Sequence, residues 1–502
     1  MSKRGWSAGL SLWIGMALFA AVALPVSVGA QPDGIVQEGL TPVIIDTDMA
    51  LDDWIAILYL LQRPDLDIKA LTVTGTGEAH CKPGMSNAQH LLALGGKPEV
   101  PVACGRETPL QGDHVFPLDW RNGMDSMLSL PLPANTTPLP EITANDLIAS
   151  VLNESPEPVT IVTLGPLTTL GELLEAQPGL IDHINMIYIM GGAVNVPGNL
   201  LGFAGENTTA EWNIYIDPHA ANLVLASGAP VTLVPLDVTN TVPITWDFYR
   251  QFQHDRQTPQ ADFVFRALSK NRWFLRQGGY YFWDPLTAVI AADASIAVIE
   301  PQTIRVIEDE GPESGRTRID PAGSPMGIAT QVDGERFGAT LLNVLNGRAV
   351  DAPLPDVLIS AEEMQRNKGI VLRWYTEVWG KAETLVADQL AARDYVIHSN
   401  ADNLDLAQLL GSIEQIHTAL SDIEISVDVV AAEGDRVATM IVLRGLHTGT
   451  SPEGVFAVEP TGNEITFRMN VVSYLVDGEL VEEWVTFDMM GPLMMIGYLP
   501  AP

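Results

Sequence analysis

Apolar residues in the first two thirds of the chain fall into short continuous runs, separated by longer stretches with helical spacing. The runs lie at residues 43–45, 68–73, 159–164, 186–190 and 231–234. Continuous apolar runs are typical of strands buried on both faces of a largely parallel sheet. Helix-like stretches such as Asp53–Leu61 lie between them. This alternation predicts an open, mostly parallel α/β fold over residues 40–350, with its site at the carboxyl ends of the strands.

The pattern changes after residue 350. A proline-punctuated segment, Val-Asp-Ala-Pro-Leu-Pro-Asp at 350–356, predicts a linker, which we place at 351–362. A helix-like stretch follows, and beyond it come β-rich segments at 423–431, 436–446, 464–477 and 480–487. Helices followed by antiparallel strands describe a smaller α+β domain, which we place at 363–502.

The first thirty residues have the order of a secretory signal. Lys3 and Arg4 precede an uncharged, largely apolar stretch that ends in small residues at 28–30. An uncleaved membrane anchor is the competing interpretation, because the stretch is nearly long enough to span a bilayer. Pro25 and the small residues favour cleavage. We therefore expect a signal peptide at 1–30, a periplasmic or secreted protein, and no membrane association after cleavage.

The net charge of the chain argues against one class of binding partner. The chain of 502 residues has 27 Lys and Arg against 62 Asp and Glu, a formal net charge of −35. Such a field repels the phosphate backbone, so we expect no nucleic-acid polymer as a partner. Apolar residues nonetheless make up 47% of the chain and charged residues only 18%, so we expect folded domains rather than a disordered acidic polymer.

The two cysteines, Cys81 and Cys104, leave two interpretations open. An oxidising compartment would allow one disulfide between them. Two unpaired buried thiols are an equally good alternative. Neither cysteine has the spacing of a metal site.

The strongest chemical signal is a cluster of carboxylates directly after the first strand. Asp46, Asp48, Asp52 and Asp53 lie within eight residues, and they repel one another unless a cation or shared protons compensate. An oxygen-only ligand set suits Ca²⁺ or Mg²⁺ and argues against zinc. The alternative is that acidic residues merely stabilise a helix N-terminus. That role would account for Asp52 and Asp53 but not for the other two, so we predict a metal site.

With these residues the sequence resembles the inosine-uridine preferring nucleoside hydrolases. Their fingerprint, Asp-x-Asp-x-x-x-Asp-Asp, is matched without a gap at 46–53. Further motifs of the family follow in order: Val-Thr-Leu-Gly-Pro-Leu-Thr at 162–168, Met-Gly-Gly at 190–192, Ala-Glu-Trp-Asn-Ile-Tyr-Ile-Asp-Pro at 210–218 and Trp-Asp-Pro-Leu at 283–286. The resemblance covers about 42–348 and implies hydrolysis of the N-glycosidic bond of a nucleoside, its small-molecule substrate. It also implies a homo-oligomer.

The resemblance implies a role for individual residues. Ca²⁺ would be bound by the carboxylates of Asp48, Asp53 and Asp284 and by the backbone carbonyl of Leu164. Asp48 would also be the general base for the attacking water, in a reaction that passes through an oxocarbenium-like state. The substrate would be bound by Asp52, Met190, Asn199, Asn207, Glu211, Asn213 and Trp283.

Two departures from the family bear on substrate choice. Well-studied relatives carry a His where this chain has Trp283, and that His is assigned as the acid that protonates the departing base. We therefore predict a purine-leaning enzyme in which Trp283 stacks on the base, with Tyr280, Tyr281, Trp273 and Trp212 as neighbours. The family also usually has an Asn near Thr76. The neighbouring Gly75 and Gly77 either form a tight turn alone or lie at a ligand, and both interpretations stay open.

The C-terminal domain resembles the SnoaL-like polyketide cyclase or ester cyclase family over about 365–497. Ordered motifs carry this resemblance, among them Trp-Tyr-Thr-Glu-Val-Trp at 374–379 and Asp-Gly-Glu-Leu-Val-Glu-Glu-Trp at 477–484. It implies a cone-shaped α+β fold around an apolar pocket. The polar candidates are His398, His447 and Asp488. A binding or dimerisation module is favoured over a second enzyme.

Two further hypotheses compete with nucleoside hydrolysis. The first is a nucleoside- or ribose-binding protein without turnover, in which Trp283 has replaced the catalytic acid. The second is an enzyme whose main chemistry lies in the C-terminal domain. The complete set of aspartates favours turnover, because a mere binder would not need so many like charges around a water.

Overall fold

The computed structural model describes residues 39–499 except 201, 357–358, 400–402, 453 and 455. The signal peptide predicted at 1–30 lies outside the described residues, and the predicted linker at 351–362 lies partly outside them. Among the helices that are described, none combines the length and the apolar character that a membrane span requires.

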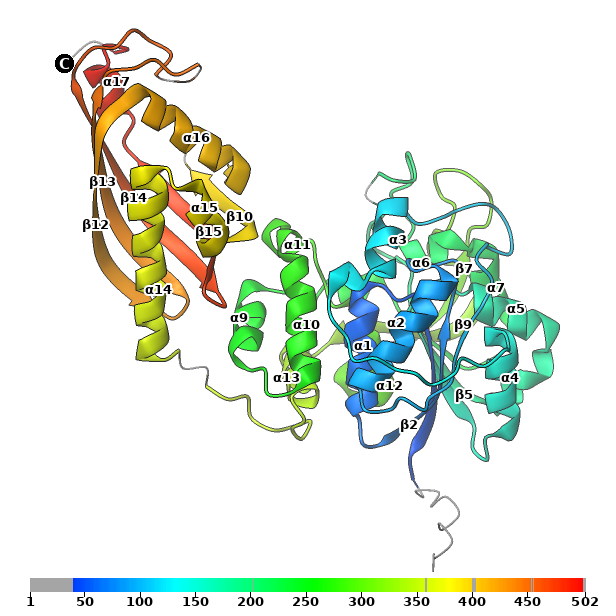
Figure 1. Cartoon of the computed structure of the whole chain (residues 1–502). Coiled ribbons are helices and arrows are strands. Elements are labelled where there is room, and N and C mark those ends of the chain that lie inside the picture. Colours follow the sequence, from blue (N-terminus) through cyan, green and yellow to red (C-terminus); the bar gives the residue numbers. More distant parts are fainter. Residues whose placement is uncertain are drawn as a thin grey trace, which may run out of the picture. The chain divides into compact units, whose positions relative to one another are not determined.

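A nine-stranded sheet forms the centre of the first domain (Figure 1). Its strands are β1 (Thr41–Thr47), β2 (Leu66–Val73), β3 (Val102–Cys104), β4 (Val159–Thr163), β5 (Ile184–Met190), β6 (Val231–Val234), β7 (Ala297–Val306), β8 (Thr317–Ile319) and β9 (Ser324–Val332). Their order is β3-β2-β1-β4-β5-β6-β9-β7-β8. The pairs from β3 to β9 are parallel, and β7 pairs antiparallel with β9 and β8. The predicted α/β class is confirmed.

Helices cover both faces of this sheet. One core contains α1 (Leu51–Gln62), α2 (Cys81–Leu94), α10 (Pro259–Lys270), α12 (Trp283–Ala292) and α13 (Gly334–Leu345), and the other contains α4 (Ala144–Glu154), α5 (Thr168–Ala176) and α7 (Pro218–Ala226). The remaining helices are α3 (Leu118–Asp125), α6 (Trp212–Ile216), α8 (Leu236–Thr239), α9 (Trp246–His254) and α11 (Arg272–Gln277). In β1, Val43 and Ile45 belong to one core and Ile44 to the other, because successive side chains of a strand point to opposite faces.

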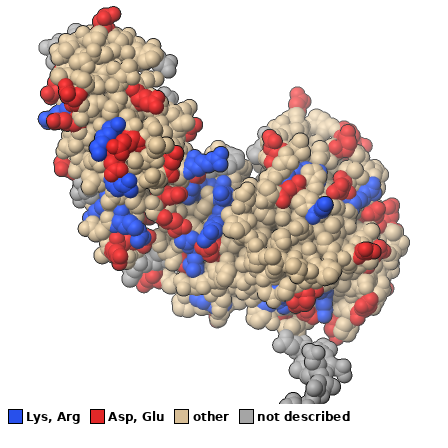
Figure 2. Space-filling model, viewed as in Figure 1, with Lys and Arg blue, Asp and Glu red and all other residues tan. Residues whose placement is uncertain are grey.

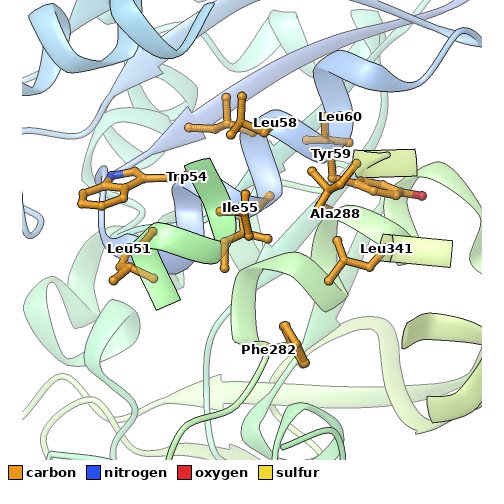
Figure 3. Packing of buried hydrophobic residues seen from close by; sticks show 14 of the residues in the cluster. Leu51, Trp54, Ile55, Leu58, Tyr59, Leu60, Phe282, Ala288 and Leu341 are labelled. Carbon is orange, nitrogen blue, oxygen red and sulfur yellow. The ribbon is translucent and has the colours of Figure 1, made fainter. Parts of the chain in front are cut away.

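Helix α1 is enclosed by protein. Ten of its 12 residues are buried, as expected for a helix that is apolar almost all round. Figure 3 shows side chains of α1 packed with those of α12 and α13, among them Tyr59, Ala288 and Leu341. Packing therefore fixes the position of α1, and with it the two aspartates of its first turn, Asp52 and Asp53.

The order of the strands reverses at β1. The chain adds β2 and β3 on one side of β1, and β4, β5 and β6 on the other. Open α/β sheets bind their ligands at such a reversal, beyond the carboxyl ends of the strands. Asp46 and Thr47 are the last residues of β1, so the aspartate cluster begins at the position where a ligand is expected.

The second domain is an α+β unit with a sheet and a core of its own. Its elements are α14 (Ala361–Arg373), a π-helix (Trp374–Trp379), α15 (Thr384–Leu390), β10 (Ala391–Ser399), β11 (Asn403–Asp405), α16 (Leu406–Ala419), β12 (Leu420–Glu433), β13 (Arg436–His447), β14 (Glu464–Val476), β15 (Glu479–Phe487) and α17 (Met490–Met495). The order is β11-β10-β15-β14-β13-β12, with β10 and β15 parallel and the other pairs antiparallel. The α+β prediction is confirmed.

Charged side chains of both signs are spread over the surface in view (Figure 2). Over the whole sequence, Asp and Glu outnumber Lys and Arg by 62 to 27. Most of this acidity on the visible face is therefore solvated, and the acids that carry chemistry have to be sought among buried residues.

Cys81 and Cys104 form a disulfide. It joins the first residue of α2 to the last residue of β3. This outcome decides between the two interpretations that the sequence left open. The bridge also fixes the end of the loop between β2 and α2, which contributes to the site described below.

Removing this cross-link is expected to lower the free energy of unfolding. The bridge spans 23 positions, and closing a loop of this size in the unfolded chain is worth about 3 kcal/mol. Urea unfolding with and without a thiol reductant measures the loss. The Cys81→Ala/Cys104→Ala double variant is the control, since its curve should not respond to reductant. A wild-type curve that is equally insensitive would contradict the prediction.

Candidate active site

A tight turn carries the aspartate cluster from β1 into α1. Met49 has φ of 64°, a left-handed conformation that non-glycine residues seldom adopt and that is often held at functional sites. Thr47 Oγ1 accepts the Met49 N–H at 3.0 Å, and the Met49 carbonyl accepts Trp54 Nε1 at 2.7 Å. The strained residue is thus anchored to the buried helix, and this places Asp48 beside the first turn of α1.

Three carboxylates meet at this point. Asp52, Asp53 and Asp284 each offer an oxygen, and these oxygens lie within 4.8 Å of one another. Asp284 is the second residue of α12, which packs on α1. Asp48 adjoins the group, because its backbone N–H donates to Asp53 Oδ1 at 3.1 Å. Helices far apart in sequence therefore bring the predicted ligands Asp48, Asp53 and Asp284 together.

Several of these buried carboxylate oxygens have no hydrogen-bond donor. Among the described residues, Asp46 Oδ2, Asp53 Oδ2 and Asp284 Oδ1 are buried without a partner. Asp53 Oδ1, by contrast, accepts from Thr47 and from Asp48. A buried anionic oxygen without a donor is costly. Unpartnered carboxylate oxygens fit a cation that prefers oxygen ligands.

The cluster resists ionisation when no cation is bound. Burial raises the pKa of Asp46, Asp52 and Asp53 from 3.8 to about 7 each. Burial also raises the pKa of Asp48 and Asp284 well above the usual value, and the charge of neighbouring Asp53 adds to the shift of both. A bound cation would offset this repulsion, so proton binding and cation binding should compete at this site.

A second group of predicted residues assembles around the start of α6. Glu211 caps this helix: Oε1 accepts the N–H of Asn213 at 2.9 Å, and Oε2 accepts those of Gly192 and Ile214 at 3.0 and 3.2 Å. The Asn213 amide donates to the carbonyls of Leu164 and Met190 at 3.1 and 3.3 Å. The structure thus brings Glu211, Asn213, Leu164 and Met190 together.

Asn199 and Asn207, the other asparagines predicted to bind substrate, form hydrogen bonds within the protein. Asn199 Oδ1 accepts the N–H of Trp212 at 3.1 Å. Asn207 is buried, its Oδ1 accepts from Thr209 and Ala210, and its Nδ2 donates to the Ser314 carbonyl. The amide oxygen of Asn207 therefore closes its own loop, and the amide nitrogen ties this loop to Ser314.

Trp283 lies beside Asp284 within an aromatic group. Its ring centroid is 5.6 Å from that of Tyr280 and 5.8 Å from that of Tyr281, and its Nε1 donates to Asn240 Oδ1 at 3.3 Å. It also packs against a small hydrophobic cluster of Met190, Ala193 and Leu236. Trp212, predicted as a neighbour, belongs to a different cluster with Phe116, Trp120 and Phe203. The side chain of Trp273, also predicted there, lies outside the described residues.

The loop between β2 and α2 contributes contacts that the sequence did not assign. The N–H of Glu78 donates to Asp48 Oδ2 at 3.2 Å. A Cβ at Gly77 would lie 2.0 Å from Asp48 Cβ, so only glycine allows this approach. The hydroxyl of Thr76, near which the family usually has an Asn, bonds to Thr168 Oγ1 at 3.0 Å. The only sequence signal for these contacts was the pair of glycines after a strand.

Comparison with known proteins identifies the first domain. A family model described as inosine-uridine preferring nucleoside hydrolase matches residues 43–339, more than half of the chain. The chain belongs to this family. Its relatives include the pyrimidine-specific ribonucleoside hydrolase RihA of Escherichia coli, 38% identical over 203 residues. That match spans 40% of this chain and 62% of the relative's length.

Solved structures share the fold of this hydrolase domain. A plant nucleoside hydrolase, PpNRh1, is 29% identical with a TM-score of 0.56, and the match covers 61% of this chain and 99% of the plant chain. A purine-preferring ribonucleoside hydrolase from Gardnerella vaginalis is 28% identical with a TM-score of 0.53, and that match covers 61% of this chain and 98% of the other. The nucleoside hydrolase fold predicted from the sequence is confirmed.

The second domain matches a family model described as SnoaL-like polyketide cyclase over residues 369–495. The fusion that the sequence predicts is therefore confirmed. The three polar candidates of this domain lie in different surroundings. His398 Nε2 contacts Glu482 Oε1 at 2.7 Å, buried His447 accepts the N–H of Thr461, and Asp488 accepts that of Met490. No hydrogen bond joins any two of the three within the described part of the chain.

Glu483 is the buried acid of the second domain that the sequence did not single out. Its Oε2 accepts from Trp374 Nε1 at 3.0 Å and from the Tyr395 hydroxyl at 2.5 Å. Its Oε1 accepts from the hydroxyls of Tyr375 and Ser473 at 2.9 and 2.5 Å. Burial still raises its pKa, although these bonds oppose the shift. With two donors on each oxygen, Glu483 needs no cation.

The pKa of Asp46 predicts how the stability of the metal-free hydrolase depends on pH. Because the folded protein holds this proton up to about pH 7 and the unfolded chain only to about 3.8, ionisation costs folding free energy as pH rises through this window. The substitution Asp46→Asn removes this cost of ionising a buried carboxyl. In the presence of chelator, the free energy of unfolding of the variant should therefore rise relative to that of wild type between pH 4 and 8, by up to about 4 kcal/mol.

Urea unfolding at a series of pH values measures this difference. Asp67→Asn, at a half-exposed carboxylate paired with Lys69, is the matched control and should show no comparable trend. A constant difference between Asp46→Asn and wild type over this range would contradict the assignment.

Proposed function

We propose that this protein is a Ca²⁺-dependent ribonucleoside hydrolase that cleaves the N-glycosidic bond to give ribose and a free base. The observation that carries the proposal is the convergence of Asp48, Asp52, Asp53 and Asp284 beyond β1, with carboxylate oxygens that lack donors. A binder of a neutral sugar would gain nothing from burying so many like charges, whereas cationic charge developing on the sugar is stabilised by them.

The cation would be held by Asp48, Asp53, Asp284 and the Leu164 carbonyl. When bound, it supplies positive charge that lowers the pKa of a water and orients the ribose. Only oxygen ligands are present, which favours Ca²⁺ or Mg²⁺ over zinc, and the resemblance to the family favours Ca²⁺ of the two. The Leu164 carbonyl already accepts one hydrogen bond from Asn213, and a carbonyl oxygen has a second lone pair for a metal.

Different side chains of the protein activate the water and bind the hydroxyls of the sugar. Asp48 acts as the base that removes the proton of the attacking water, and its orientation is fixed by the N–H groups of Ala50 and Glu78. Asp52 accepts from a ribose hydroxyl. Glu211 Oε1 has one backbone donor and keeps an acceptor position, and Asn213 keeps its amide oxygen, so both can accept from the remaining hydroxyls.

The base side favours purines. Trp283 lies next to Asp284 with Tyr280 at its edge, and an aromatic ring there can stack on a departing purine. Relatives differ on this point, since RihA is named pyrimidine-specific and the Gardnerella vaginalis enzyme purine-preferring. Pyrimidine ribonucleosides are therefore the second candidate substrates.

Export of the protein is part of the proposal. The basic start, apolar stretch and small residues of the first thirty positions are those of a signal peptide. The disulfide between Cys81 and Cys104 suits an oxidising compartment. The SnoaL-like domain is proposed as a binding or assembly module, because its most buried acid is fully occupied by internal donors.

Ribose release should require both the cation and Asp48. We expect hydrolysis of ribonucleosides that stops with chelator and returns on adding Ca²⁺. Asp48→Ala should lower kcat by a factor of about 10² to 10⁴, the usual contribution of a general base, while Asp67→Asn retains wild-type rates. The measurement is free reducing ribose from inosine, guanosine, adenosine, uridine and cytidine.

The outcomes of this assay separate the alternatives. Binding of nucleosides without any ribose release by wild type, with Ca²⁺ supplied, would establish the binding protein instead. Strong preference for uridine would overturn the purine assignment but not the hydrolase. Activity that survives chelator and Asp48→Ala would contradict the mechanism itself.

A further inference from the structure

Helix α6 carries the proposed sugar-binding residues but has only five residues, Trp212–Ile216. Glu211 caps its amino end, and Asn213 lies in its first turn. The Tyr215 N–H donates to the Glu211 carbonyl at 2.8 Å, and the last carbonyl groups of any helix lack partners within it. The position of Glu211 and Asn213 therefore depends on what holds the carboxyl end of α6.

His114 holds that end. Its Nδ1 lies 2.6 Å from the carbonyl oxygen of Tyr215, and its ring stacks on the Tyr215 ring with the two centroids 3.9 Å apart. Its Nε2 lies 3.1 Å from Oε2 of Glu310, and its side chain is only 10% exposed. One imidazole ring therefore joins α6 to a residue that lies far along the chain.

The partners of His114 determine which protons its ring needs. A carbonyl oxygen and an ionised carboxylate only accept hydrogen bonds, so both ring nitrogens have to donate. A neutral imidazole carries one N–H group, whereas an imidazolium carries two. The imidazolium therefore makes both contacts at once, and the neutral ring keeps only one of them.

The ionisable groups around His114 come from three segments. Tyr215 belongs to α6, Glu310 to the loop between β7 and β8 (residues 307–316), and Asp113 to the loop of His114 itself. Burial raises the pKa of Tyr215, followed by the charges of Glu310 and Asp113. The charged neighbours of the stacked pair are thus both acidic. A cation over a tyrosine ring and at the carboxyl end of a helix is favourable.

The loop that carries Glu310 packs closely against α6. Gly315 in this loop has φ of 78°, and a Cβ there would lie 2.7 Å from Tyr215 Cα. Only glycine allows this approach. Ala210, just before α6, forms an antiparallel bridge with Arg316 of the same loop.

Helix α7 fixes the other side of the loop. Glu308 Oε1 accepts from Asn222 Nδ2 at 2.6 Å, and Glu308 Oε2 lies 2.9 Å from His219 Nδ1. Both partners belong to α7. The loop between β7 and β8 therefore has a defined position of its own, from which Glu310 can hold His114.

We propose that His114 is a positioning residue for sugar binding, whose imidazolium joins the carboxyl end of α6 to Glu310 and thereby holds the residues at the amino end of α6 against the ribose. The inference rests on the proposed function and deepens it. Glu211 and Asn213 would contact the ribose both before and during cleavage, so displacing them weakens the binding of substrate and transition state alike. Loss of the contact, by mutation or by deprotonation of the ring, therefore raises KM and changes kcat little.

Steady-state kinetics of the full-length protein with saturating Ca²⁺ test this role on the ribonucleoside that it cleaves best. His114→Ala removes both hydrogen bonds and the stacking, and it should raise KM fivefold or more while kcat stays within twofold. Glu310→Ala removes a partner whose side chain is 67% exposed, and it should raise KM about twofold to fivefold, as expected for an exposed ion pair. The double variant should match His114→Ala, because both substitutions break the same contact.

The pH dependence of KM separates this role from a merely structural one. His114→Arg keeps a planar cation with several N–H donors at every pH. The carboxylates of the site titrate alike in wild type and in His114→Arg, so the ratio of wild-type KM to that of His114→Arg isolates the effect of His114. This ratio should rise at least threefold between pH 5.5 and 9, as the imidazolium gives up a proton. A constant ratio would overturn the proposal.

His183→Ala is the matched control, because this histidine directly precedes β5, at the opposite end of the strand from the site. It should leave KM and kcat within twofold. Thermal unfolding midpoints show whether each variant is folded, and Glu310→Ala decides the question if His114→Ala does not fold. An unchanged KM in Glu310→Ala, or a loss confined to kcat in His114→Ala, would overturn the role of His114 while wild-type turnover upholds the hydrolase. A wild type that releases no ribose from any ribonucleoside would overturn the proposed function and this inference with it.

Discussion

The burial of like charges is the constraint on which the hydrolase domain depends. Asp46, Asp48, Asp53 and Asp284 are each at most 2% exposed, and their mutual repulsion raises the cost of burying them. Such an arrangement persists only where the surrounding structure dictates it. The enclosed helix α1, the left-handed Met49 and the reversal of strand order at β1 all serve to hold these carboxylates in place, at some expense of stability.

The chain contains a second buried acid that is stabilised in the opposite way. Glu483 receives four protein donors, whereas Asp53 and Asp284 each keep an oxygen with none. A carboxylate whose acceptor positions are filled supports a core and has little left for a ligand. One whose positions are open requires a partner from solution. This difference, rather than burial alone, distinguishes the candidate active site from the structural acid.

Local sequence patterns predicted the fold class and a metal site at Asp46–Asp53, because both depend on residues that are close together in the sequence. The run Val43-Ile44-Ile45 predicted a strand buried on both faces. The four aspartates from Asp46 to Asp53 predicted a metal site at the end of that strand. The parts that could not be predicted depend on distant contacts. Glu78 meets Asp48 only because Gly77 allows close approach, and the amide of Asn207 is bonded within its own loop and to distant Ser314. The contacts of Glu78 and Asn207 cannot be read from the residues next to them in sequence. The four donors of Glu483 likewise come from separate elements.

The two sides of the site differ in how much their sequence is constrained. On the side where we propose that the sugar binds, Glu211 is tied to the backbone of α6, and Asn213 is tied to the carbonyls of Leu164, next to the end of β4, and of Met190, the last residue of β5. A change there would disturb these backbone contacts as well. The side chain of Trp283, by contrast, bonds to Asn240 alone among the described residues. The hydrogen bonds of the fold therefore constrain Glu211 and Asn213 more tightly than Trp283, which lies in the aromatic group where we propose that the base stacks.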